Sequence, residues 1–149
     1  MSLFRKVTDR FTSPKARISL QLSKKTFVLG EIVEATLAVS SDEEFDAKEI
    51  RAEIQCVELA RRVVGFVRTV PRESEQSRVL YFAKLRTAGP TLITQGYSHV
   101  FPVSIKIPAD GMPTYFQDIE LRVQWYVKGV IAINGRPDVT SSPTEIQVT

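Results

Sequence analysis

Residues that could carry out chemistry are scarce in this sequence of 149 residues, which contains one cysteine and one histidine. The single cysteine, Cys56, excludes a disulfide within the chain and suits a reducing compartment. One cysteine and one histidine, His99, cannot assemble a histidine–cysteine zinc cluster. The chain has no G-x-S-x-G nucleophile motif, and its seven glycines are scattered rather than gathered in a phosphate-binding loop. We therefore expect no enzyme activity, no cofactor and no metal.

Long apolar runs are also absent. No stretch approaches the roughly 20 residues that span a bilayer. Charged residues interrupt the first eleven positions, MSLFRKVTDRF, so that no apolar core of a signal peptide is present. These features predict a cytoplasmic protein. The net charge of +3 permits contact with an anionic membrane or nucleic acid, but few aromatics lie among the arginines, and we do not expect nucleic-acid binding.

What the chain does contain is apolar residues at every second position, which is typical of strands with one buried and one wet face. Val123, Trp125 and Val127 share such a face, and we expect all three to be buried. Gly129 then suggests a bulge or bend in the strand. The alternation predicts an all-β, immunoglobulin-like antiparallel β-sandwich forming one domain over residues 16–149. The expected strands are 16–22, 31–40, 49–56, 100–108, 118–127 and 144–149.

Two segments do not follow this alternation. In the N-terminal arm, residues 1–15, four apolar residues follow a spacing near 3.6, which leaves open a short amphipathic helix, a loose arm or an extra edge strand. These residues, which could contact a membrane or a partner, are Leu3, Phe4, Val7 and Phe11. Between Val57 and Leu92 the sequence predicts a long hairpin with an arginine-rich rim. Any helix outside the arm is expected only in the region Leu80–Leu92.

Two groups of charged residues are candidates for interaction. The acidic residues of the segment SDEEFD, residues 41–46, could hold calcium, but their spacing fits a solvated turn better. These acidic residues form an acidic rim, and the arginines of the hairpin form a basic rim. The acidic rim of one molecule could contact the basic rim of the next, head to tail, which would give a homo-oligomer. The acidic residues are Asp42, Glu43, Glu44 and Asp46, and the basic ones are Arg61, Arg62, Arg68 and Arg72.

Three stretches resemble the arrestin superfamily. The segment 26–35, TFVLGEIVEA, is similar to the family's pattern of an aromatic residue, Gly-Glu and alternating apolar residues. The segments 96–108 and 112–115, GYSHVFPVSIKIP and MPTY, look like its Phe-Pro strand and Pro-Ser/Thr-Tyr turn. The segment 123–131, VQWYVKGVI, resembles its long tyrosine–valine–lysine strand. The start MSLFRKV is similar to bacterial sporulation-control arrestin-like proteins.

The resemblance implies a single arrestin-like sandwich of the N-terminal-lobe type, acting as a non-enzymatic adaptor or scaffold for protein partners. Open sheet edges are the expected binding mode, because unpaired backbone groups recruit another strand. A peripheral membrane protein and a carbohydrate-type ligand-binding sandwich remain open. The latter would need a platform of exposed aromatics, for which the candidates are Tyr97, Tyr115, Phe116 and Tyr126.

Overall fold

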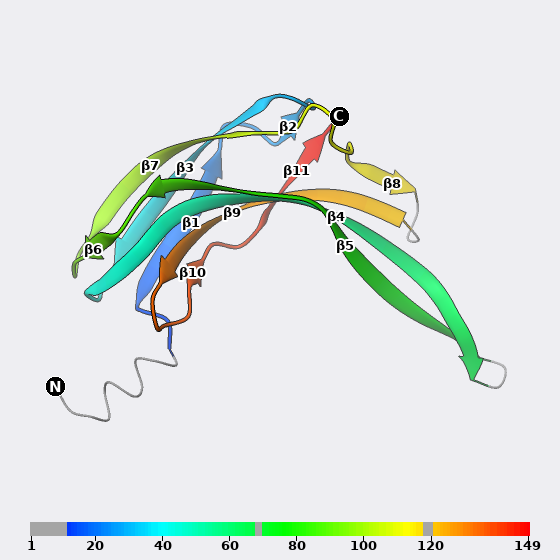
Figure 1. Ribbon diagram of the computed structural model, residues 1–149, viewed down its shortest axis with the longest axis horizontal. Coiled ribbons are helices and arrows are strands. Elements are labelled where there is room, and N and C mark those ends of the chain that lie inside the picture. The colour runs from blue at the N-terminus through cyan, green and yellow to red at the C-terminus, as the bar shows by residue number, and fades with distance from the viewer. Residues whose placement is uncertain (1–11, 68–69, 118–120) are drawn as a thin grey trace.

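The computed structural model is built from β-strands throughout the described residues, which are 12–67, 70–117 and 121–149, with the side chains of 62–67, 70–75 and 117 excepted. The strands form two sheets that face each other (Figure 1). The described part of the chain contains no helix with the length and apolar character that a membrane crossing needs. Residues 1–11, which include Leu3, Phe4, Val7 and Phe11, lie outside the described residues.

The smaller sheet has the order β1-β3-β7, and the larger sheet runs β2-β11-β9-β4-β5, with β10 and β8 also pairing with β9 and β6 with β4. The smaller sheet contains β1 (Ala16–Leu22), β3 (Ile32–Ser41) and β7 (Ser98–Lys106). The larger contains β2 (Thr26–Phe27), β4 (Phe45–Val67), β5 (Val70–Ala88), β6 (Thr91–Ile93), β8 (Tyr115–Gln117), β9 (Leu121–Ile133), β10 (Val139–Thr140) and β11 (Thr144–Val148).

The core lies between the two sheets, as the alternation predicts. Trp125 is fully buried, and Val123 and Val127 lie beside it in the same cluster, which confirms that they share a face. Alternate residues of β3 and β4 are buried in the same way. Because antiparallel neighbours place facing residues on the same side, each strand adds one row of apolar side chains to the core.

The Gly-Glu pair of the first motif forms the corner between β2 and β3. Gly30 has a φ of 86°, a backbone conformation that glycine adopts without strain. The Glu31 amide donates to the Val28 carbonyl at 3.0 Å and closes a four-residue turn. The Glu31 carboxylate in turn accepts from the Val28 amide at 3.0 Å and pairs with Lys24. These contacts, led by Lys24, lower the pKa of Glu31.

The predicted bulge at Gly129 is wrong. Strand β9 passes through this residue, and its pairing with β4 has no register shift there. A Cβ at Gly129 would lie 2.7 Å from Leu37 Cδ2 and 2.9 Å from Ile18 Cδ1. A larger residue at this position would therefore have to displace side chains of the opposite sheet.

Strands β4 and β5 form the predicted long hairpin, and its turn end extends beyond the rest of the sandwich (Figure 1). The expectation that a helix could form in Leu80–Leu92 is wrong, because this region belongs to β5 and β6. The hairpin register shifts at three places, and one shift leaves Leu80 as an extra residue between Val79 and Tyr81. Such a bulge places two successive side chains on one face, and both Leu80 and Tyr81 pack against the core.

Candidate interaction surfaces

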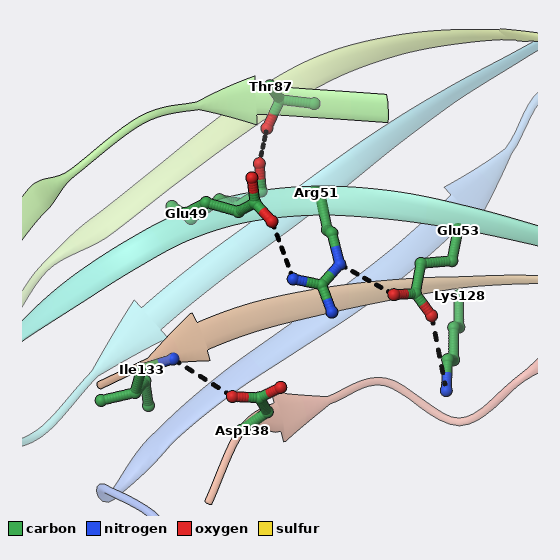
Figure 2. Close-up of polar contacts among 8 residues, drawn as sticks. Glu49, Arg51, Glu53, Thr87, Lys128, Ile133 and Asp138 are labelled. Atoms are coloured by element: carbon green, nitrogen blue, oxygen red, sulfur yellow. Dashed lines mark hydrogen bonds and ion pairs between the residues drawn. The ribbon is translucent and has the colours of Figure 1, made fainter. Parts of the chain in front are cut away.

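A cluster of four charged side chains lies on the outer face of the larger sheet (Figure 2). Arg51 Nη1 contacts Glu49 at 2.8 Å and its Nε contacts Glu53 at 2.7 Å. The ammonium group of Lys128, from β9, lies 3.7 Å from the other oxygen of Glu53. The side chain of Arg51 is 13% exposed and that of Glu53 is 9% exposed. The four charges balance, so the cluster links β4 to β9 without a net charge.

Arg51 remains charged in this setting. Its burial acts to lower the pKa, but hydrogen bonds to Glu53 and Glu49 outweigh that effect and raise the pKa above its ordinary value. The sequence contained a signal for this cluster that the search for motifs missed. Glu49, Arg51 and Glu53 occupy alternate positions of one strand, so they share a face of the sheet.

A shallow hollow of about 250 Å³ adjoins this cluster. Glu53 and Lys128 provide its charged groups, while Val57, Tyr126 and Pro143 line it with apolar surface. The Tyr126 hydroxyl donates to Gln124 at 2.5 Å. Burial, with Glu145 adding in the same direction and Arg122 opposing, raises the pKa of Tyr126. The phenol is therefore a neutral group at physiological pH.

The acidic loop makes contacts within the molecule. Glu43 accepts from Arg136 at 2.8 Å and from the Lys15 amide at 2.8 Å, and Asp42 pairs with Arg17 at 3.4 Å. Partial burial acts to raise the pKa of Glu43, but the hydrogen bonds from Arg136 and Lys15 outweigh it and lower the pKa. No group of three or more His, Cys, Asp or Glu side chains converges as metal ligands in the described part of the chain.

The remaining acidic residues of the predicted rim, Glu44 and Asp46, are exposed. Asp46 lines a second hollow of about 580 Å³, which also includes Lys48 and Arg136. Arg136 was not among the predicted site residues, because no pattern in the sequence links it to a loop 93 residues away.

The arginines of the predicted basic rim lie in the extended half of the hairpin. Arg61 and Arg62 belong to β4 and Arg72 to β5. Arg68 lies outside the described residues, as do the side chains of Arg62 and Arg72. Contact between the acidic rim of one molecule and the basic rim of another therefore stays a prediction. Nearby on β5, Arg78 pairs with Glu58 at 3.4 Å.

The single cysteine is buried in the core, and the single histidine contacts an aromatic ring. Cys56 is fully buried, and this burial, with Glu58 adding in the same direction, raises the pKa of its thiol to about 11. A neutral buried thiol is a poor nucleophile. His99 is exposed on β7 and stacks edge-on against Phe101, with ring centres 4.5 Å apart.

The four aromatic candidates for a ligand platform lie at three separate places. The segment between β6 and β7, which contains Tyr97, lies at the other end of the sandwich from β8, which carries Tyr115 and Phe116 (Figure 1). Tyr126 lies in the hollow beside Lys128. Phe116 is 69% exposed and Tyr115 is 41% exposed.

The free sheet edges at β7 and β5 differ in their capacity to pair with another strand. On β7, the Ile107 amide donates to Glu31 and the Tyr97 carbonyl accepts from Ser41, so odd-numbered residues pair with β3. The even-numbered residues, including Pro102, therefore direct their backbone groups to the free edge. Because Pro102 has no N–H, it interrupts the donors of that edge. Strand β5, with 19 residues, pairs only with β4 among the described strands.

The two sheets, their strand order and the extended hairpin form an arrestin-like β-sandwich fold. The chain is similar to the crystal structure of Spo0M, a sporulation control protein from Bacillus subtilis, with a TM-score of 0.67 and 22% sequence identity. The alignment covers 91% of this chain and 50% of that one, so this chain spans half the length of Spo0M. No protein-family model and no curated protein sequence matches the chain.

Proposed function

We propose that this protein is a non-enzymatic arrestin-like interaction module in the cytoplasm, and that it binds a protein partner by strand pairing along the free edge of β5. The observation that carries the proposal is the edge itself. Strand β5 extends for 19 residues with β4 on one side and no described strand on the other. Unpaired N–H and C=O groups along an edge are a template for another strand.

The side chains along β5 support this edge over that of β7. Val79 is 54% exposed and Phe82 is 45% exposed, so the middle of β5 presents apolar surface beside the unpaired backbone. Most natural edge strands are protected by charge, by proline or by a covering segment. In β7, Pro102 provides such protection, whereas the described middle of β5 contains no proline.

The proposal is tested by photo-crosslinking in the native host. A photoreactive amino acid in place of Phe82 should give a discrete crosslinked species, because it lies beside the free edge. The same residue in place of Val100, which is 57% exposed on the outer face of the smaller sheet, is the matched control. Adding Val79→Lys to the Phe82 probe should abolish the crosslink. Equal crosslinking from positions 82 and 100 would contradict binding at β5.

A further inference from the structure

The outer face of β5 carries two positive charges beside an exposed aromatic ring. The alternate residues Phe82, Lys84 and Arg86 are all exposed and share one face of the strand. Lys84 lies opposite Glu53 of β4, so this is the face that carries the cluster around Arg51. The ammonium group of Lys84 lies 5.8 Å from the centre of the Phe82 ring. The apolar and the positive parts of the row therefore form one surface beside the free edge.

Neither positive charge of this row has a carboxylate partner among the described side chains. Glu53, the acidic residue opposite Lys84, contacts Arg51 and Lys128 instead. The cluster around Arg51 is neutral by itself. Within the described part of the outer face, Lys84 and Arg86 therefore add two positive charges that the cluster does not compensate.

Positive charge beside a sheet edge selects among the strands that could pair with it. Charged residues, lysine above all, discourage an edge from pairing indiscriminately with other edges. Opposite charges directly across two strands, in contrast, stabilise their pairing, because the Cβ atoms of facing residues lie about 4.5–5.5 Å apart. A carboxylate on an added strand would therefore come within reach of Lys84 or Arg86, whereas a basic residue at the same position would be repelled.

We infer that the strand that pairs with the free edge of β5 is acidic, with carboxylates opposite Lys84 and Arg86 and an apolar residue opposite Phe82. This inference rests on the proposed function, because it states the chemistry of the partner at the same edge. Side chains on one face of a strand recur at every second residue. The partner segment therefore has an apolar residue and two acidic residues at successive alternate positions, in that order along the direction of β5.

The first test adds charge reversal to the photoreactive residue at position 82 in the native host. Lys84→Glu with Arg86→Glu should reduce the crosslinked species at least about tenfold, because attraction at two positions becomes repulsion. The matched control is Lys25→Glu with Lys106→Glu, which changes the net charge equally at two exposed sites away from β5. This control should leave the crosslink unchanged.

The outcomes of this test separate the inference from the proposed function. A crosslink from position 82 that persists undiminished in the charge-reversed variant would overturn the acidic partner and leave strand pairing at β5 standing. An equal loss in the control variant would also overturn it, because the effect would then belong to net charge. The absence of any crosslink from position 82 without further substitutions would remove both.

A second measurement shows that the charge-reversed variant folds and that the edge selects for charge. The probe is a fluorescent peptide with a central valine, two glutamates on each side and threonines between them, which reads the same in both directions. In fluorescence anisotropy, the wild type should bind it at least about tenfold more tightly than the same peptide with lysines in place of the glutamates. The variant Lys84→Glu with Arg86→Glu should reverse this preference. Equal binding of the two peptides to the wild type, or binding of neither, would overturn the inference.

Discussion

At the scale of single residues, Trp125 joins the core to the loop before β8. Its ring is fully buried, lies 5.9 Å from that of Tyr81, and its Nε1 donates to the Met112 carbonyl at 2.8 Å. We expect Trp125→Ala to lower the free energy of unfolding by about 3–5 kcal/mol, the range for a large aromatic removed from a core. Urea denaturation measures this, and a loss below about 1 kcal/mol would contradict the packing described.

Gly129 gives a second prediction at this scale. A methyl group there must displace Leu37 and Ile18, which are buried in the opposite sheet. We expect Gly129→Ala to destabilise the protein by about 1–3 kcal/mol, as overpacking does. Combining it with Leu37→Val should recover part of the loss, because the shorter side chain leaves room. Additive losses in the double variant would show that the methyl group is accommodated elsewhere.

The two residues differ in how far the sequence could predict them. The position of Trp125 followed from alternation along its own strand. The role of Gly129 depends on side chains of β1 and β3, which the local pattern of β9 does not contain. A glycine within a strand looks the same in the sequence whether it bends the backbone or leaves room for a side chain of the opposite sheet.

At the scale of the elements, the cluster around Arg51 joins β4 to β9. Replacing Arg51 by Met leaves Glu49 and Glu53 without their shared cation, and breaking a buried pair in this way costs about 3–5 kcal/mol. Arg78→Met is the control, because Arg78 is 70% exposed and its pair with Glu58 should contribute about 0–1 kcal/mol. Equal effects of the two substitutions in denaturant titrations would contradict the special role of Arg51.

The contact between the acidic loop and the β9–β10 loop should depend on pH. The pKa of Glu43 is lowered from 4.5 in the folded protein, so its pair with Arg136 stabilises the fold above pH 4.5 and is lost as the pH falls through the lower native pKa. The difference in unfolding free energy between the wild type and Arg136→Met should thus be largest near neutrality and shrink in acid.

The control for this pH dependence is Arg17→Met. The side chains of Arg17 and its partner Asp42 are 69% and 64% exposed, and such pairs contribute little. This variant should follow the wild type closely across the whole range in thermal unfolding scans. A difference for Arg136→Met that does not change between neutrality and acid would mean that the Glu43 contact adds no pH-dependent stability.

At the scale of the whole molecule, the sequence predicted the two-layer sandwich but not its strand order. Alternation shows that a strand has one buried face, whereas the choice of neighbour depends on contacts between distant segments. The parallel pairing of β2 with β11 joins residues about 120 positions apart, and no local pattern encodes it. The bulge at Leu80 was missed for a related reason, since the extra residue is defined by the register of β5 against β4 and not by the local pattern of β5.

Self-association through the acidic and basic rims remains a prediction about the assembled molecule. Contact between the acidic rim of one copy and the basic rim of the next would be head to tail, so the assembly would grow with concentration and fall apart in high salt, because exposed charge pairs are screened. Light scattering at low salt should therefore show a mass that rises with protein concentration, and high salt should return that mass to one chain. A mass that stays at one chain at low salt and high concentration, or an assembly that salt does not affect, would contradict contact between the rims.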